Sequence, residues 1–262
     1  MKIFEELVET LRDAGVGAGD TLCIYSDITS FGIPESIRDD LMTKGMDVLP
    51  EVYVNSFESL VGEKGTLMMP TYTYSACNDE LFDVGETPCI LGVLPEYFRK
   101  QPGVQRSVHP VFSFAAKGPR AEPLLQVDDF DCFSEKSIFG KLYDDNVYYL
   151  IFGVEFERGA GFVYLAEQKA KVPYRMFKNF TGKIRDVDGS ERVVDVRFLV
   201  RKSLSLETQW YKFERIAIDE GVVKELFFNG GKMLLVRAQE IEALLQRELK
   251  KDEYCLIKKE TL

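Results

Sequence analysis

Short apolar runs alternate with helix-like patterns through the first two thirds of this 262-residue chain. The runs predicted as strands cover 21–26, 66–69, 111–116 and 147–154. Between them, helical patterns cover 46–61, 92–101, 119–126 and 161–170. Strands that alternate with helices form neighbours joined by crossovers, which is how a layered α/β domain is built. The pattern therefore predicts an α/β fold, with a mixed, largely parallel sheet that carries helices on both faces.

The pattern changes after Arg175. Apolar runs at 182–187 and 192–200 flank Asp188-Gly189, and an Asp-Gly pair between such runs is a strong hairpin signal. This C-terminal part of the sheet is therefore expected to be antiparallel. The remaining predicted elements are a helix at 208–220, strands at 223–228 and 232–237, and a closing helix at 238–250.

The chain is expected to form one domain over residues 1–262, because no repeat, low-complexity tract or Pro/Ser-rich linker interrupts it. The turn-rich stretch 71–91 is long enough to be a functional loop. The N-terminal residues MKIFEELVETLRDAG carry acidic residues where a secretory signal needs an apolar stretch, and their apolar residues have the spacing of an amphipathic helix.

The longest strongly apolar run, 147–154, is far shorter than the roughly 20 residues that cross a bilayer. Five scattered cysteines without a CxxC pair argue against a disulfide framework or a zinc site. We therefore expect a cytoplasmic protein with no membrane contact and no bound metal.

The formal net charge of −10 opposes nucleic-acid binding, which needs basic patches that release counterions from phosphates. It suits a cationic small molecule, although an acidic balance is also an ordinary solubility device. We expect small-molecule partners and no nucleic acid. The sequence leaves the assembly open, with a homodimer among the options.

The segment Arg106-Ser107-Val108-His109-Pro110 contains the only histidine of the chain. It lies in a turn before the predicted strand 111–116, where a reactive side chain could be held rigidly beside a cleft. Histidine has an unperturbed pKa of about 6.5, so it can take a proton from an amine near neutral pH. His109 is therefore a candidate general base, and a buried or merely exposed ring is the alternative.

Two other segments carry candidate site residues. A polar turn follows the first strand, where ligands bind in many α/β sheets, and it could donate hydrogen bonds to a pyrophosphate or a pantetheine amide. Its residues are Ser26, Asp27, Ile28, Thr29, Ser30, Phe31 and Gly32. Tyr164 and Glu167 share a face of the predicted helix 161–170, where the carboxylate could orient an imidazole or hold a substrate ammonium. An ordinary polar loop and a solvated helix charge are the alternatives.

Together these segments resemble the aminoglycoside 3-N-acetyltransferase family, antibiotic N-acetyltransferases whose fold is unrelated to that of the GNAT enzymes. Residues 87–125, with their RSxHP core, resemble the central motif of the family. YSDITSFG (25–32) corresponds to its His-Ser-Ser-Leu-like loop, GTLMMPTYTYS (65–75) to its Gly-Thr-Leu-x-Met-Pro-Thr strand, and SIFGKLY (137–143) to its Ser-Pro-Phe-Gly-x-Leu segment. The similarity runs in order along roughly residues 1 to 240.

The resemblance implies an αβα layered sandwich, acetyl-CoA as the donor, and direct transfer from the thioester to an amine without a covalent enzyme intermediate. By the same analogy, the turn at 26–32 and Thr71 would hold the pantetheine and pyrophosphate. Arg106 and Ser107 of the central motif are assigned to the same donor site. Tyr164, Asp79 and Glu80 are assigned to the acceptor amine.

Two departures from the family pattern concern chemistry. Where the family often has a Thr-x-x-His-x-x-Glu run, this chain has GFVYLAE at 161–167, so a second histidine is missing. Asp27 stands where a serine is commoner, which places a negative charge near the implied phosphate site. Either His109 acts as the base with Glu167 in support, or the acceptor pocket has been rebuilt for another substrate.

We therefore expect an acetyl-CoA-dependent N-acetyltransferase that acts on a primary amine of an amino sugar or aminoglycoside, with His109 and Glu167 as its catalytic residues. One alternative is a biosynthetic N-acyltransferase for a nucleotide-linked or phosphonate-bearing amino compound, with an acyl group larger than acetyl. Another is a catalytically silent CoA-binding protein. A third is a hydrolase that uses Cys23 or Cys77. The sequence leaves open whether the role is antibiotic resistance or biosynthesis.

Overall fold

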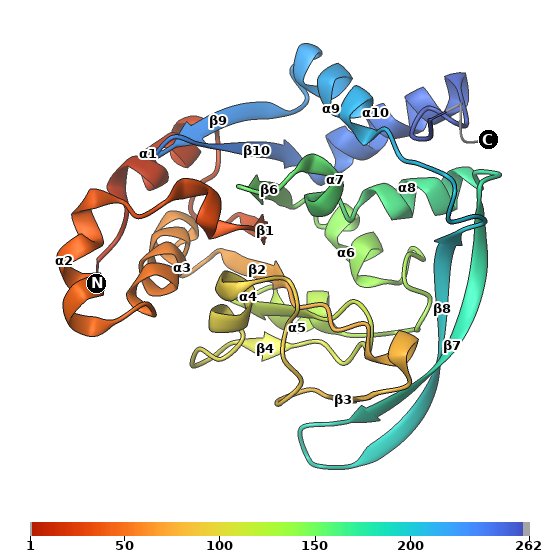
Figure 1. Cartoon of the computed structure of the whole chain (residues 1–262), viewed down its shortest axis with the longest axis horizontal. Coiled ribbons are helices and arrows are strands. Elements are labelled where there is room, and N and C mark those ends of the chain that lie inside the picture. The colour runs from red at the N-terminus through yellow and green to blue at the C-terminus, as the bar shows by residue number, and fades with distance from the viewer. Residues whose placement is uncertain (1, 259–262) are drawn as a thin grey trace.

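The computed structural model describes residues 2–258, which form two sheets. The strands of the larger sheet are β1 (Thr21–Ser26), β2 (Thr66–Pro70), β4 (Gln105–Arg106), β5 (Phe114–Lys117), β6 (Tyr148–Phe152), β9 (Lys224–Phe228) and β10 (Gly231–Arg237). The smaller sheet contains β3 (Leu81–Asp83), β7 (Arg175–Arg185) and β8 (Glu191–Arg201). Figure 1 shows the smaller sheet extending from the body that the larger one forms.

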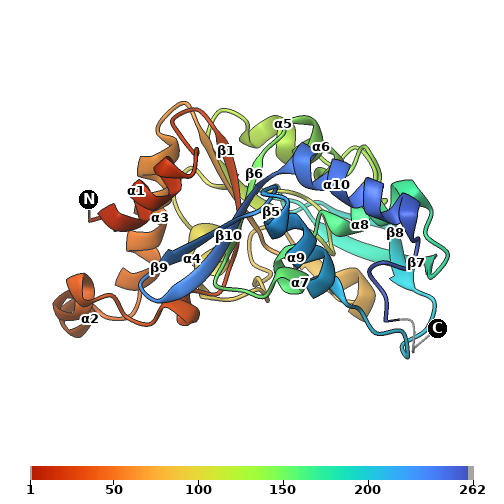
Figure 2. The same cartoon turned by 90° about the horizontal axis from the view of Figure 1, so that it is seen from above.

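Helices cover both faces of the larger sheet (Figure 2). On one face pack α1 (Glu5–Asp13), α2 (Arg38–Lys44), α3 (Val48–Val61) and α4 (Val93–Phe98). On the other pack α5 (Ala121–Leu125), α6 (Ile138–Asp144), α7 (Phe156–Gly159), α8 (Val163–Ala170), α9 (Trp210–Asp219) and α10 (Ala238–Lys251). Three short 3₁₀ helices are η1 (Ile28–Phe31), η2 (Glu35–Ile37) and η3 (Ser75–Asn78). The predicted αβα layering is confirmed.

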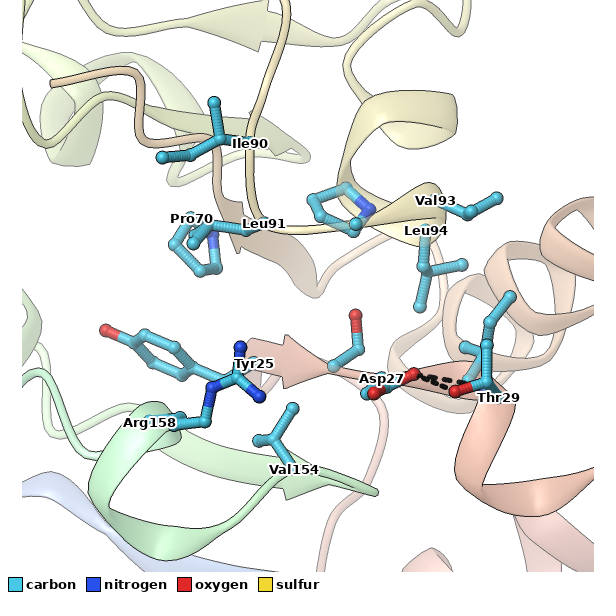
Figure 3. A pocket seen from close by; sticks show the side chains of 14 residues that line it. Tyr25, Asp27, Thr29, Pro70, Ile90, Leu91, Val93, Leu94, Val154 and Arg158 are labelled. Carbon is cyan, nitrogen blue, oxygen red and sulfur yellow. Dashed lines mark hydrogen bonds between the residues drawn. The ribbon is translucent and has the colours of Figure 1, made fainter.

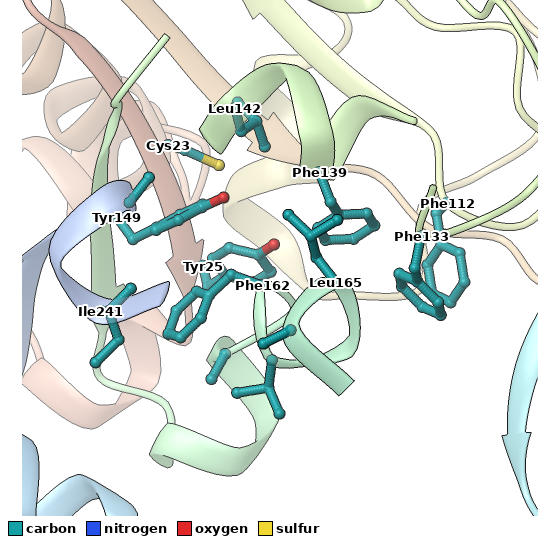
Figure 4. Close-up of a cluster of buried hydrophobic side chains, with 14 of the residues drawn as sticks. Cys23, Tyr25, Phe112, Phe133, Phe139, Leu142, Tyr149, Phe162, Leu165 and Ile241 are labelled. Carbon is teal, nitrogen blue, oxygen red and sulfur yellow. The ribbon is translucent and has the colours of Figure 1, made fainter. Parts of the chain in front are cut away.

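The two faces of the sheet build two separate hydrophobic clusters. Along β1, Cys23 and Tyr25 belong to one cluster, and Leu22 and Ile24 belong to the other. This alternation follows from the two-residue period of a strand. Figure 4 shows the first cluster, in which Tyr25 packs with side chains from α6, α8 and α10. Each fully buried apolar side chain contributes about 1.5–3 kcal/mol, so the central strand stabilises both layers.

The strand order of the larger sheet is β4-β5-β2-β1-β6-β10-β9. Only β1 pairs in parallel, with β2 and with β6. The other neighbours are antiparallel. The prediction of a largely parallel sheet therefore holds for its centre alone. The predicted strand 111–116 begins later, at Phe114, and runs antiparallel because β4 and β5 form a hairpin around residues 107–113.

The predicted hairpin around Asp188-Gly189 is confirmed as β7 and β8, but it lies in the smaller sheet with β3. The antiparallel C-terminal part of the larger sheet is instead formed by β9 and β10. The sequence patterns did not predict α2, α6, α7, β3 or β4, most of which are too short to show a period. No helix among residues 2–258 has the length and apolar character needed to span a membrane.

Gly153 follows β6 in the chain and packs closely against the turn that follows β1. Its φ is +73°, and a Cβ there would lie 2.4 Å from the Asp27 carbonyl oxygen and 2.6 Å from Phe31 Cε2. The backbone N–H of Asp27 donates to the Phe152 carbonyl at 2.8 Å, and Ser30 Oγ donates to the Gly153 carbonyl. A side chain at position 153 would therefore push the turn away from the sheet.

Gly153→Ala is expected to lower the free energy of unfolding by more than the roughly 1–3 kcal/mol that a left-handed conformation costs a non-glycine residue, because backbone must also move. Urea unfolding measures the loss. Gly19→Ala is the matched control, since Gly19 has φ +95° and no atom within 4 Å of a Cβ. Equal losses in the two variants would contradict the packing role of Gly153.

Candidate active site

A cavity of about 300 Å³ opens beyond the carboxyl ends of β1 and β2 (Figure 3). Most of its wall is formed by isoleucine, leucine, valine and proline side chains. Its polar residues are Tyr25, Ser26, Asp27, Thr29 and Arg158. Ligands of open α/β sheets bind outside the carboxyl ends of the strands. This strand-end cavity is therefore the candidate ligand site.

The predicted turn contributes its first four residues, 26–29, to the cavity wall. Asp27 caps η1, because its Oδ1 accepts the backbone N–H of Thr29 at 3.1 Å. The last three residues of the turn serve the fold instead. Phe31 is buried and stacks on Phe152 with ring centroids 4.0 Å apart, Ser30 bonds to Gly153, and Gly32 ends η1. A ligand-binding role for Ser30, Phe31 and Gly32 is not supported by their contacts.

Ser26 and Arg158 have polar atoms without a protein partner. Ser26 Oγ is buried at the cavity wall and makes no hydrogen bond with a described residue. The guanidinium of Arg158 projects from α7 toward the cavity, and no side-chain hydrogen bond or ion pair to it occurs within residues 2–258. Sequence reasoning missed Arg158, because α7 is four residues long and gives no periodic signal.

The residues around Thr71 and Arg106 that the resemblance assigns to the donor site are hydrogen-bonded to other groups of the protein. The Arg106 guanidinium donates to the carbonyls of Thr71 at 2.9 Å and Thr87 at 2.6 Å, and its Nε lies 3.2 Å from two hydroxyls. Ser107 Oγ accepts the backbone N–H of Phe114 at 2.9 Å. Thr71 is fully buried. These residues fasten the β4–β5 hairpin to the loop after β2, so their implied role in binding the donor does not fit their contacts.

His109 lies in the same hairpin and is 5% exposed. Its Nδ1 accepts the backbone N–H groups of Val111 at 3.2 Å and Phe112 at 3.0 Å. The proton of the neutral ring is therefore assigned to Nε2, which is buried without a partner among the described residues. Burial lowers the pKa of His109 to about 4. A ring held this way offers a donor rather than a free basic nitrogen, so these bonds oppose the predicted role as a base.

Glu167 is fully buried in α8, and its carboxylate binds Tyr174 and Arg175. Oε1 accepts the Tyr174 hydroxyl at 2.8 Å, and Oε2 lies 2.8 Å from Arg175 Nη2. No hydrogen bond or ion pair links Glu167 to His109 within residues 2–258, so the predicted support of the imidazole is not present. Burial raises the pKa of Glu167, and the nearby Arg175 guanidinium opposes that rise.

Tyr164 lies beside this ion pair, as its spacing from Glu167 predicts. Its ring stacks on Phe133 at 4.8 Å, and the Arg175 guanidinium carbon lies 4.8 Å from the ring centroid. Asp79 and Glu80 are exposed after η3, where Asp79 bonds to Lys183 at 2.8 Å. Among the described residues, no group of three or more His, Cys, Asp or Glu is placed to hold a metal ion.

Glu167→Gln is expected to lower the free energy of unfolding by about 3–5 kcal/mol, because it leaves the buried Arg175 charge without a counter-ion. Urea unfolding at neutral pH measures the loss. The double variant Glu167→Gln/Arg175→Met should recover part of it, since it removes the unpaired charge. Unchanged stability in Glu167→Gln, combined with lost activity, would argue for a catalytic carboxylate instead.

Comparison with known proteins gives consistent matches. The family model described as aminoglycoside 3-N-acetyltransferase matches residues 43–250. Aminoglycoside N(3)-acetyltransferase IV from Salmonella sp is 30% identical over 254 residues, which cover 94% of this chain and 87% of that protein. A mutant of aminoglycoside acetyltransferase AAC(3)-IVa, solved in complex with a gentamicin, superposes with a TM-score of 0.79 at 27% identity and covers 97% of this chain and 91% of its own.

A structure of AAC-IIIb with CoASH has the same fold, with a TM-score of 0.78 at 19% identity over 94% of this chain and 96% of its own. The family match covers most of the chain, and the relative from Salmonella matches nearly its whole length. The resemblance found in the sequence motifs is thus confirmed, and this chain belongs to the aminoglycoside 3-N-acetyltransferase family.

Proposed function

We propose that this protein transfers an acetyl group from acetyl-CoA to a primary amine, and that the donor binds in the strand-end cavity. The observation that carries the proposal is a cavity with an unpaired arginine and an unbonded serine hydroxyl, in a member of an N-acetyltransferase family. Two relatives support it, because AAC-IIIb was solved with CoASH and AAC(3)-IVa with a gentamicin.

The chemistry of coenzyme A matches both the polar and the apolar parts of the cavity wall. Its phosphates are anionic, and Arg158 is the only lysine or arginine among the described lining residues. Its pantetheine arm alternates methylene groups with amides, which suits an apolar wall that carries the free Ser26 hydroxyl. Arg158 would therefore bind a phosphate, and Ser26 would bond to a pantetheine amide.

The reaction is a direct transfer between two bound substrates. The amine nitrogen attacks the thioester carbonyl carbon, the C–N bond forms, and the C–S bond then breaks. The amine proton leaves, and the thiolate of CoA is protonated. Because Nδ1 of His109 is engaged by two backbone N–H groups, we propose that the amine attacks in its unprotonated form. A base role for His109 is the alternative that its variants test.

The acceptor is proposed to be an amino-sugar amine, as in an aminoglycoside, with a nucleotide-linked or phosphonate-bearing amine as the alternative. The strongly acidic chain, at net charge −10, favours an acceptor with several ammonium groups. An anionic acceptor would have to approach against this charge. A screen of both acceptor classes distinguishes them.

Free CoA release from acetyl-CoA, measured with a panel of aminoglycosides and amino-sugar nucleotides, is expected to depend on the acceptor. Arg158→Gln should raise the KM for acetyl-CoA by about 10- to 100-fold, the value of a lost charge-assisted hydrogen bond, with kcat little changed. Arg215→Gln, at an exposed arginine of α9, is the control. Donor binding without release for any amine would indicate a silent CoA-binding protein.

His109→Asn is expected to keep kcat within a few-fold of the original enzyme, because the amide oxygen can accept the N–H groups of Val111 and Phe112. His109→Ala leaves both groups unpaired, at about 1–3 kcal/mol each, so it should lose stability first. If both variants fold fully and each still loses about 10²–10⁴-fold in kcat, His109 acts as the base after all. Steady-state kinetics with a parallel melting curve separate these results.

The pH dependence of stability follows from the lowered pKa of His109. Between its ordinary value of 6.5 and its folded value of about 4, the unfolded chain binds a proton that the folded chain does not. This contribution to stability is present above pH 6.5 and is lost as the pH falls toward 4. Between about pH 7 and about pH 4.5, the free energy of unfolding measured with urea should fall by about 2–3 kcal/mol more in the original protein than in His109→Asn. Equal losses would contradict the buried neutral ring.

A further inference from the structure

A second hollow, of about 510 Å³, lies between α8 and the base of the β7–β8 hairpin (Figure 1). We call it the α8 hollow. It is separate from the strand-end cavity, because the two have no lining residue in common. Its apolar wall is formed by Val172, Met176, Phe177 and Leu199. Its polar residues are Glu167, Gln168, Lys171, Arg175 and Arg197. The proposed transfer gives this hollow no role.

The α8 hollow is basic, although the whole chain has a net charge of −10. Among its described lining residues, three are cationic and one is anionic. The anionic residue, Glu167, is neutralised inside the protein, because its carboxylate accepts the Tyr174 hydroxyl and lies 2.8 Å from Arg175 Nη2. Lys171 and Arg197 are left as the cations that can attract an anion into the hollow.

Both of these cations have N–H groups available. Lys171 is exposed, and its ammonium forms no hydrogen bond or ion pair with another residue of 2–258. The guanidinium carbon of Arg197 lies 3.4 Å from the centroid of the Phe177 ring, which holds the group flat. Its Nη1 donates to Asp131 Oδ2 at 3.2 Å. Because a guanidinium carries five N–H donors in a rigid fork, this single bond leaves several of them for a ligand.

Two buried atoms of lining residues lack a hydrogen-bond partner in the described part of the chain. They are Gln168 Oε1 and Arg175 Nε. Gln168 Nε2 donates to Asp131 Oδ1 at 3.1 Å, so the orientation of this amide leaves Oε1 as an acceptor without a donor. Buried polar groups are normally satisfied. An unpaired acceptor and an unpaired donor beside one basic hollow therefore indicate a ligand with anionic oxygens and an O–H.

We infer that the α8 hollow binds a phosphate group, held by the Lys171 ammonium and the Arg197 guanidinium. The oxygens of a phosphate can pair with both cations, and a guanidinium fork matches two of them. Inorganic phosphate keeps an O–H at neutral pH, which can donate to Gln168 Oε1. A carboxylate or a sulfate has no such proton. Free phosphate and the phosphate ester of a small molecule share this chemistry, and the inference holds whether or not the proposed transfer is correct.

Inorganic phosphate, titrated into the full chain and followed by calorimetry, tests the inference. Arg158→Gln is the starting protein, because it removes the cation of the strand-end cavity. In this background Lys171→Gln should weaken the phosphate affinity by about 10- to 100-fold, the value of one lost charge-assisted hydrogen bond. Lys178→Gln is the matched control, since Lys178 is an exposed lysine of β7 that does not line the hollow. Its phosphate affinity should stay unchanged.

Arg197→Gln checks the second cation. It should weaken the phosphate affinity by a similar factor, and a melting curve recorded without phosphate shows whether the loss of the Asp131 contact has altered the fold. Phosphate should raise the melting temperature of the Arg158→Gln protein, and this rise should disappear when Lys171→Gln and Arg197→Gln are combined in it. Unchanged affinity in the folded Lys171→Gln variant would overturn the inference. So would an equal loss in Lys178→Gln, which would show nonspecific charge screening.

Three other probes identify the ligand more closely. Sulfate should bind more weakly than phosphate, because it has no proton for Gln168, and equal affinity would overturn the assignment to phosphate. Glucosamine 6-phosphate, compared with glucosamine, tests the ester as the source. Tighter binding than inorganic phosphate that is lost in Lys171→Gln would identify a phosphate ester, whereas affinity no greater than that of inorganic phosphate would identify the free anion. These readouts measure binding alone, so a failure of acetyl transfer would contradict the proposed function without affecting them.

Discussion

The burial of β1 on both faces is the constraint on which the rest of the structure depends. β1 lies between β2 and β6, and its side chains alternate between the two hydrophobic clusters. A slip of one residue would move Leu22 and Ile24 into the layer of Cys23 and Tyr25, so the register is strongly specified. The same register places Tyr25 and Ser26 in the wall of the strand-end cavity, where the turn at 26–32 begins. The position of the site therefore follows from core packing.

Hydrogen-bond occupancy distinguishes structural polar residues from available ones. Arg106, Ser107 and His109 belong to the motif that most clearly marks the family, yet Arg106, Ser107 and the Nδ1 atom of His109 are bonded within the β4–β5 hairpin and its neighbouring loop. Ser26 belongs to the motif at 25–32 and Arg158 to none of the quoted motifs, and both have polar atoms at the cavity wall without partners among the described residues. Buried polar groups are normally satisfied, so an unsatisfied one beside a cavity is the stronger indication of a ligand. In this chain the motif identifies the family, and the unpaired groups at its wall support the strand-end cavity as the candidate ligand site.

Sequence patterns predicted those parts of the fold in which burial produces a period. β1, β2 and β6 are continuous apolar runs because both of their faces are covered, and α3 and α8 were found by helical spacing. Hydrophobicity does not encode strand direction, which is why the antiparallel course of β5 was missed. The turn after β1 was predicted in part because strand ends are general ligand sites. The place of Arg158 in the cavity wall depends on contacts between segments far apart in the chain, so no local pattern could reveal it.

The replacement of histidine by tyrosine changes what the site can do with a proton. The family resemblance places a histidine at the position of Tyr164, and burial raises the pKa of the Tyr164 hydroxyl. Such a hydroxyl remains a neutral donor and cannot take a proton from an ammonium near neutral pH. In the proposed transfer without a base, the acceptor arrives unprotonated, and the unprotonated fraction falls tenfold for each unit by which the amine pKa exceeds the pH. The proposed reaction therefore favours a weakly basic amine attached to a sugar ring over a strongly basic alkyl amine such as a lysine side chain, whose pKa is about 10.4.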